Sequence, residues 1–130
     1  MTETVSENSE VTVLLVDDNP QNLKVLYETL KDKGYRLLIA NEGEKALDLA
    51  HRHHPEVILL DIMMPEMDGY TLVTRIKEDP ALKEMYVMLH TSLSGVFNRA
   101  MVQKVGADDF MAKFSPDELA ERVMEIIDQH

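Results

Sequence analysis

The sequence predicts an α/β fold in which a single five-stranded parallel sheet is doubly wound, so that helices cover both of its faces. Short apolar segments bounded by turn-forming residues alternate five times with segments of helical periodicity. Each connection is long enough to cross back over a sheet, which favours parallel strands joined by right-handed crossovers. The chain has 130 residues. That length suits one domain that buries roughly two thirds of the surface its unfolded chain exposes.

The five apolar segments are the predicted strands. They are short, rich in branched side chains and flanked by turn formers. Parallel strands that are covered on both faces are continuously apolar, and these segments have that character. The predicted strands are residues 11–16, 35–40, 57–60, 86–90 and 109–112.

The segments between the strands carry apolar residues at intervals of three and four, the periodicity of an amphipathic helix. In the first of them Pro20 suits the first turn and Gly34 suits the end. In the last, Ser115, Pro116 and Glu118 form a capping box. Residues 11–130 are therefore predicted to be one domain, preceded by a disordered segment at 1–10. The predicted helices lie within residues 19–34 and near 43–53, 69–78, 95–105 and 116–128.

Composition excludes several classes of protein. The chain has no cysteine, so disulfides, thiolate metal sites and thiol nucleophiles are not available to it. Its net charge of -11 disfavours direct binding to nucleic acid, which depends on Lys and Arg at phosphates. The amino terminus lacks the pattern of a signal peptide, and no apolar run approaches the ~18 residues of a membrane span. We expect a cytoplasmic protein that does not insert into membranes.

Polar residues follow the predicted strands where these reach one edge of the sheet. Asp17 and Asp18 follow the first strand, Asp61 the third, Thr91 the fourth and Lys113 the fifth. In open α/β sheets, ligands bind at the carboxyl ends of the strands. Three clustered carboxylates repel one another, and a hard cation such as Mg²⁺ relieves that repulsion. Such a cation would in turn hold a phosphate.

These residues, together with "LLDIMMPEMDG" and "GADDF", resemble the receiver domain of two-component response regulators over roughly residues 11–128. The resemblance implies a flavodoxin-like sheet with strand order 2-1-3-4-5. It implies a signalling domain that promotes its own phosphorylation and dephosphorylation, and not a dedicated enzyme. The implied partners are a sensor histidine kinase or histidine phosphotransfer protein and a downstream effector protein or domain, with the receiver itself a monomer or weak homodimer.

The resemblance also implies roles for the acidic residues. Asp61 is the implied phosphoacceptor, which attacks a phosphohistidine and becomes an acyl phosphate. Asp18 and Asp61 would ligate Mg²⁺ directly, Asp17 through water, and Met63 through its backbone carbonyl. A simpler interpretation of the first pair is that Asp18 or Asn19 only caps the first helix.

Three further residues take implied roles around the phosphoryl group. The ammonium of Lys113 would neutralise phosphoryl charge, and the hydroxyl of Thr91 would bond a phosphoryl oxygen. Movement of Thr91 would open a space that Phe110, the implied aromatic switch, fills. The alternatives are a surface lysine, a strand-end hydroxyl bonded to its own backbone, and a core aromatic. The family usually has proline after this lysine, whereas this chain has Phe114, so we expect a trans bond or a rearranged loop.

Rival functions fit the residues less well. A flavodoxin needs a phosphate-cradling loop rich in Ser, Thr and Gly after the first strand, and "DDNPQN" presents carboxylates there. A phosphohydrolase of the haloacid dehalogenase type needs two aspartates spaced two apart, whereas Asp17 and Asp18 are adjacent. A pseudo-receiver would be expected to lack part of the acidic set or the lysine. The imidazoles of "HRHH" at 51–54 more simply face solvent at a helix end than bind a metal.

Two lineages are suggested by different parts of the chain. The stretch from residue 88 to 123 is most similar to the receiver of chemotaxis coupling proteins of the CheV type. The stretch from residue 13 to 70 is similar to receivers attached to sensor kinases or cyclic-dinucleotide enzymes. The chain is thus expected to be either a single-domain regulator or a receiver taken from a longer protein.

Overall fold

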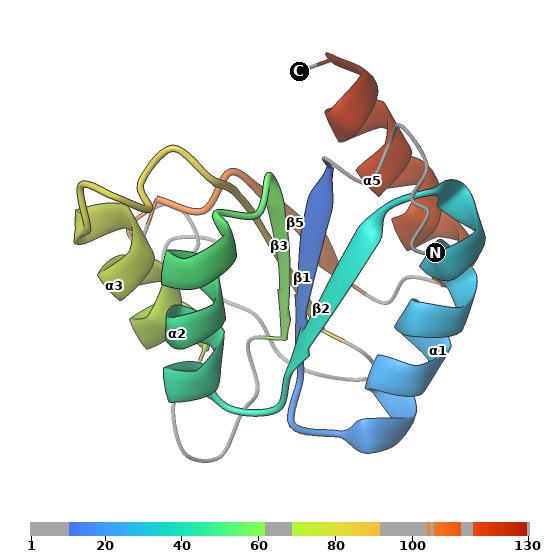
Figure 1. Ribbon diagram of the computed structural model, residues 1–130, viewed down its shortest axis with the longest axis horizontal. Coiled ribbons are helices and arrows are strands. Elements are labelled where there is room, and N and C mark those ends of the chain that lie inside the picture. Colours follow the sequence, from blue (N-terminus) through green and yellow to red (C-terminus); the bar gives the residue numbers. More distant parts are fainter. Residues whose placement is uncertain (1–10, 62–68, 92–103, 105, 113–115, 130) are drawn as a thin grey trace.

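The structure is a computed structural model that describes residues 11–61, 69–91, 104, 106–112 and 116–129 (Figure 1). Strands and helices alternate along this part of the chain. The elements are β1 (Thr12–Val16), α1 (Pro20–Leu30), the 3₁₀ turn η2 (Lys31–Lys33), β2 (Arg36–Ala40), α2 (Gly43–His53), β3 (Val57–Asp61), α3 (Gly69–Glu78), β4 (Tyr86–Thr91), β5 (Asp109–Ala112) and α5 (Pro116–Gln129).

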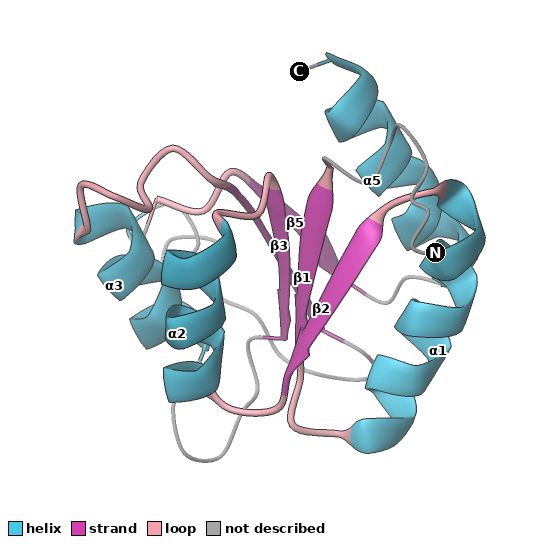
Figure 2. Cartoon of the chain, in the orientation of Figure 1, coloured by secondary structure: helices cyan, strands magenta, loops and turns pink. Residues whose placement is uncertain are grey.

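The strands form one five-stranded sheet in the order β2-β1-β3-β4-β5, and every neighbouring pair is parallel. This confirms the predicted fold class and the strand order implied by the resemblance. The chain places α1 and α5 on one face of the sheet and α2 and α3 on the other (Figure 2). The strand order reverses between β1 and β3, so their carboxyl ends flank the place where such sheets bind ligands.

The interior consists of two apolar layers, one on each face of the sheet. Successive side chains of a strand point to opposite faces, and β1 supplies both layers. Val13 and Leu15 pack toward α1 and α5, whereas Leu14 and Val16 pack toward α2 and α3. All four are fully buried. A strand buried on both faces explains why all four residues from Val13 to Val16 are apolar before Asp17.

Observed boundaries differ from the predicted ones by small amounts at the site edge. Strand pairing continues one residue beyond the predicted segments 57–60 and 86–90, so Asp61 and Thr91 are the last residues of β3 and β4. Gly34 follows η2 with φ 87, a left-handed conformation that glycine adopts without a steric penalty, as its predicted role at the helix end requires. The predicted disordered segment 1–10, the predicted cap Ser115 and, except for Lys104, the predicted helix 95–105 lie outside the described residues.

Among the helices that the structure describes, none combines the length and the apolar character needed to cross a bilayer.

Candidate metal and phosphoacceptor site

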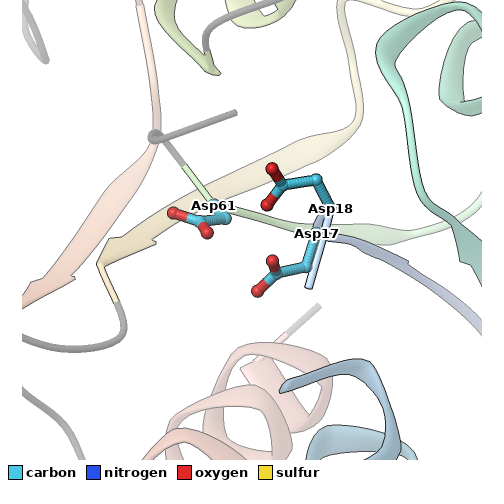
Figure 3. A group of neighbouring side chains, drawn as sticks. All are labelled: Asp17, Asp18 and Asp61. Atoms are coloured by element: carbon cyan, nitrogen blue, oxygen red, sulfur yellow. The ribbon is translucent and has the colours of Figure 1, made fainter. Parts of the chain in front are cut away.

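Three carboxylates meet at the carboxyl ends of β1 and β3. One oxygen each from Asp17, Asp18 and Asp61 lies within 4.8 Å of the other two, and the three side chains project to the same side (Figure 3). Asp17 is fully buried, Asp61 is 4% exposed and Asp18 is partly exposed. The structure therefore brings together the three acidic residues that the sequence indicates, although Asp61 lies more than forty positions after Asp17 and Asp18.

The local structure after β1 holds Asp17 against the start of α1. The backbone N–H of Asn19 donates to Asp17 Oδ1 at 2.9 Å, and Asn22 Nδ2 donates to Asp17 Oδ2 at 3.2 Å. The N-cap of α1 is Asn19, whose Oδ1 accepts from the backbone N–H groups of Gln21 and Asn22 at 2.9 and 3.3 Å. Of the two candidate caps, Asn19 therefore has the capping role. The Asp18 carboxylate instead lies within the acidic cluster, which consists of Asp17, Asp18 and Asp61.

Opposing effects act on the charge of Asp17. Burial raises the pKa of the Asp17 carboxyl, and the negative charge of Asp18 adds to that rise. Hydrogen bonds from the Asn19 backbone and the Asn22 side chain, and a close contact with the Asp61 carboxyl, lower the pKa again. The net shift is upward. A buried carboxylate with a like charge beside it is destabilised as an anion, and a bound cation would remove that cost.

The chemistry of these donors suits a small hard cation. All three side chains offer carboxylate oxygen, the ligand type that Mg²⁺ prefers. Cysteine is absent from the chain, and no histidine joins the cluster among the described residues. The acidic cluster could therefore hold Mg²⁺.

A histidine that the sequence reasoning missed lies beside this cluster. His90 in β4 is paired in register with Asp61 in β3. Because Met88 packs toward α1 and α5, strand alternation directs His90 to the same face. The imidazole is 1% exposed, and burial lowers its pKa from 6.5 to about 4, so it is neutral at pH 7. In the sequence, the only indication that His90 belongs to this site is its position two residues after Met88 in a predicted strand.

The other predicted site residues are described in part. Thr91 ends β4, and its backbone is paired with Ala112 at the end of β5. Phe110 is paired with Leu89, is partly buried and packs against the apolar layer beneath α2 and α3. Lys113 and Met63 lie outside the described residues, as does Phe114.

The histidine-rich end of α2 has a structural role in the described chain. His51 Nε2 lies 2.7 Å from Asp79 Oδ2 across the contact between α2 and the turn after α3. His54 follows the helix as its C-cap with φ 49, and its N–H donates to Ala50 O. Within the described residues, these imidazoles belong to no group of three potential metal ligands. The predicted solvent-facing helix end agrees with this arrangement.

Comparison with known proteins identifies the family. Residues 13–124 match the model of the response regulator receiver domain. The chain is 40% identical over 101 residues to "Response regulator PleD" of Caulobacter vibrioides, covering 78% of this chain and 22% of that protein. It is 39% identical over 116 residues to "Probable transcriptional regulator ycf27" of Guillardia theta, covering 88% of this chain and 44% of that protein. The chain thus spans less than half the length of these curated relatives.

A solved structure shares the whole fold. The chemotaxis response regulator CheY4 of Vibrio cholerae superposes with a TM-score of 0.80 at 27% identity. The match covers 89% of this chain and 98% of that one.

Proposed function

We propose, because the chain belongs to the response regulator receiver family, that Asp61 is the residue that accepts a phosphoryl group from a phosphohistidine. Accepting a phosphoryl group in two-component signalling is the general function of this family. The observation that carries the assignment to Asp61 is its position: it ends β3, it is 4% exposed, and its carboxylate lies in the acidic cluster.

The proposed transfer is a single displacement at phosphorus. A carboxylate oxygen of Asp61 forms a bond to phosphorus while the bond from phosphorus to the donor imidazole nitrogen breaks. The electron pair of the broken bond stays on that nitrogen, and the product on Asp61 is an acyl phosphate. Because such a reaction depends on positioning and counter-charge, the rigid strand end that carries Asp61 is well suited to present the nucleophile.

Asp17, Asp18 and Asp61 are the residues that we propose hold Mg²⁺, together with the backbone carbonyl of Met63. The donor set supports this, since three carboxylates with buried members converge within 4.8 Å. When bound, Mg²⁺ would supply positive charge to the phosphoryl oxygens. The protein's part is to keep the carboxylates close despite their repulsion, which the strand ends and the α1 turn achieve.

Lys113 and Thr91 are the proposed catalytic partners, and Thr91 with Phe110 the proposed switch. Thr91 and Ala112 are paired at the ends of β4 and β5, and Lys113 is the next residue after Ala112, which supports placing both at this edge. The ammonium would offset phosphoryl charge, and the hydroxyl would donate to a phosphoryl oxygen. Phe110 packs against the apolar layer beneath α2 and α3, and its movement is proposed to reshape the surface around the last two helices of the chain.

The partners proposed are a sensor histidine kinase or histidine phosphotransfer protein as donor and a downstream effector protein or domain as target. The cytoplasm is the proposed compartment, because a chain without cysteine suits a reducing environment. We also propose a chemotaxis coupling context of the CheV type, which rests on the sequence resemblance of residues 88–123 alone. The similarity to PleD and to CheY4 supports a response regulator without selecting one output.

The assignment to Asp61 is tested by treating the protein with acetyl phosphate and Mg²⁺ and measuring its intact mass. One added phosphate, labile to hydroxylamine as an acyl phosphate is, should appear in the wild type and disappear in Asp61→Asn. Asp32→Asn, an exposed aspartate in η2, is the matched control and should be phosphorylated normally. A hydroxylamine-stable adduct, or one retained in Asp61→Asn, would place the chemistry on another residue.

A further inference from the structure

We infer that Asn22 is a positioning residue that holds the Asp17 carboxylate in the orientation required for the divalent cation, and so ties the first turn of α1 to the acidic cluster. This inference rests on the proposed function, because it presumes that the cluster binds Mg²⁺. Asn22 is not itself a proposed ligand. Its action is through Asp17 alone, by way of the 3.2 Å hydrogen bond from Asn22 Nδ2 to Asp17 Oδ2.

The geometry of the first turn shows why this residue can reach Asp17. Asn22 is three residues after the N-cap Asn19, the position whose side chain reaches back to the N-cap backbone N–H in a capping box. Here that N–H is already taken, because it donates to Asp17 Oδ1. The Asn22 side chain, which points back toward the helix start, therefore meets the other oxygen of the same carboxylate.

The two donors at the start of α1 thus orient both oxygens of the Asp17 carboxylate and still leave acceptor positions on it. Each carboxylate oxygen can accept two hydrogen bonds, and the Asn19 N–H and Asn22 Nδ2 each take one position on a different oxygen of Asp17. A position that is used neither by these donors nor by the contact with the Asp61 carboxyl could accept a cation or its water. Partners of this kind fix the rotation of a metal-binding carboxylate, and removing them typically costs 10- to 100-fold in metal affinity.

The two donors also restrict how the Asp17 side chain can rotate, since each holds one of its two oxygens. Asp17 is fully buried, and Asp18 adds a like charge beside it. Without the Asn22 amide, one of the two hydrogen bonds shown from α1 to this carboxylate would be lost. Rotation of the side chain away from Asp18 and Asp61 would then be less restricted, so the three oxygens would converge less often.

The test is a Mg²⁺ titration of the wild type, Asn22→Leu and Gln21→Leu, followed by amide NMR shifts to obtain a dissociation constant for each. Leucine keeps the approximate shape of asparagine and removes the donor. Gln21 is the matched control, because it is exposed in the same turn and engages Asn19 through its backbone N–H. We expect the dissociation constant to rise roughly tenfold in Asn22→Leu and to stay within about twofold in Gln21→Leu.

Two measurements without Mg²⁺ separate positioning from a structural role. Asn22→Leu should remain folded with a melting temperature only modestly below that of Gln21→Leu, because the buried Asp17 carboxylate loses one donor, and the side-chain amide resonances of Asn22 should shift in Asp17→Asn. An unchanged Mg²⁺ affinity in Asn22→Leu, with normal binding by the wild type, would overturn the role of Asn22 alone. Absence of Mg²⁺ binding by the wild type would overturn the proposed metal site and this inference together.

Discussion

Asp61 at the end of β3 and His90 in β4 are paired residues of neighbouring parallel strands, and both side chains are almost completely buried. Strand alternation directs both to the face covered by α1 and α5, since Leu59 and Met88 pack there. The acidic cluster therefore has a neutral imidazole as its neighbour within the sheet. A positively charged histidine at this position would have to be desolvated, which explains the lowered pKa of His90.

The first prediction concerns acid stability. In the folded protein the pKa of His90 is about 4, whereas its ordinary value is 6.5, so the unfolded chain binds a proton first as the pH falls. The contribution of neutral, buried His90 to the free energy of unfolding is therefore complete above pH 6.5 and is lost progressively toward pH 4. We expect the free energy of unfolding to fall by about 2 kcal/mol at pH 5 through this residue alone.

Denaturant unfolding of the wild type and His90→Leu at pH 7.5 and pH 5 measures this contribution. Leucine has a similar size and no proton to bind, so the variant should lose less stability on acidification. Asp17 acts in the opposite direction, because its raised pKa makes the folded state bind a proton more readily. That effect is present in both proteins and cancels in the comparison. Equal losses in the two proteins would show that His90 is not the buried titrating group.

A second prediction concerns Lys77 in α3, whose ammonium bonds to residues just before β4 and β5. Its Nζ donates to Met85 O at 2.9 Å and Lys83 O at 3.2 Å, and it lies 2.8 Å from Asp108 Oδ2. The Lys77 side chain is only 19% exposed, and the same Asp108 oxygen accepts the backbone N–H of Val87 at 2.8 Å. One ammonium thus satisfies two carbonyls and a partly buried carboxylate.

Lys77→Met should lower the free energy of unfolding by roughly 1–3 kcal/mol, because those acceptors lose their donor in a partly desolvated place. The aliphatic stem is retained, so the effect reports the ammonium. Lys45→Met removes an exposed lysine of α2 and serves as the control, with an expected change within about 0.5 kcal/mol. Chemical denaturation measures both. If Lys77→Met loses as little free energy of unfolding as Lys45→Met, water must satisfy the acceptors of the Lys77 ammonium without cost.

Much of this fold can be predicted from the sequence because the relevant signals are local. The short apolar run before Asp61 predicts a strand buried on both faces, and a carboxylate directly after such a strand lies at its end. The same reasoning applies to Asp17 after β1. Parallel strands share one edge for their carboxyl ends, and the adjacency of β1 and β3, which the family resemblance implied, brings the two residues together.

Asn22 and His90 could not be predicted in the same way. The contact of Asn22 depends on which backbone N–H groups Asp17 and Asn19 already satisfy, and those pairings exist only once the first turn has formed. The burial of His90 depends on strand register, which pairs it with Asp61. A polar residue near a strand end is equally compatible with exposure, so composition alone does not distinguish the two cases.

The third prediction addresses the proposed switch of Thr91 and Phe110. Phe110 is only partly buried and packs against the layer beneath α2 and α3, so a deeper position would bury more apolar surface. Attraction of Thr91 to an acyl phosphate on Asp61 would favour that position by opening space beside the end of β4. A few kcal/mol separates such states in switching proteins, so one hydrogen bond and one ring can change their populations.

Amide NMR spectra of the free protein and of its complex with Mg²⁺ and beryllofluoride, which stands in for the phosphoryl group, test this coupling. Shifts should extend from Asp61 through Thr91 and Phe110 to α5 in the wild type. In Thr91→Ala the complex should still form, but the shifts at Phe110 and α5 should shrink because the hydroxyl that links them to the phosphoryl group is gone. Wild-type shifts confined to the loops at Asp17, Asp18 and Asp61 would contradict the switch. The domain would then hold phosphate without changing the surface that an effector reads.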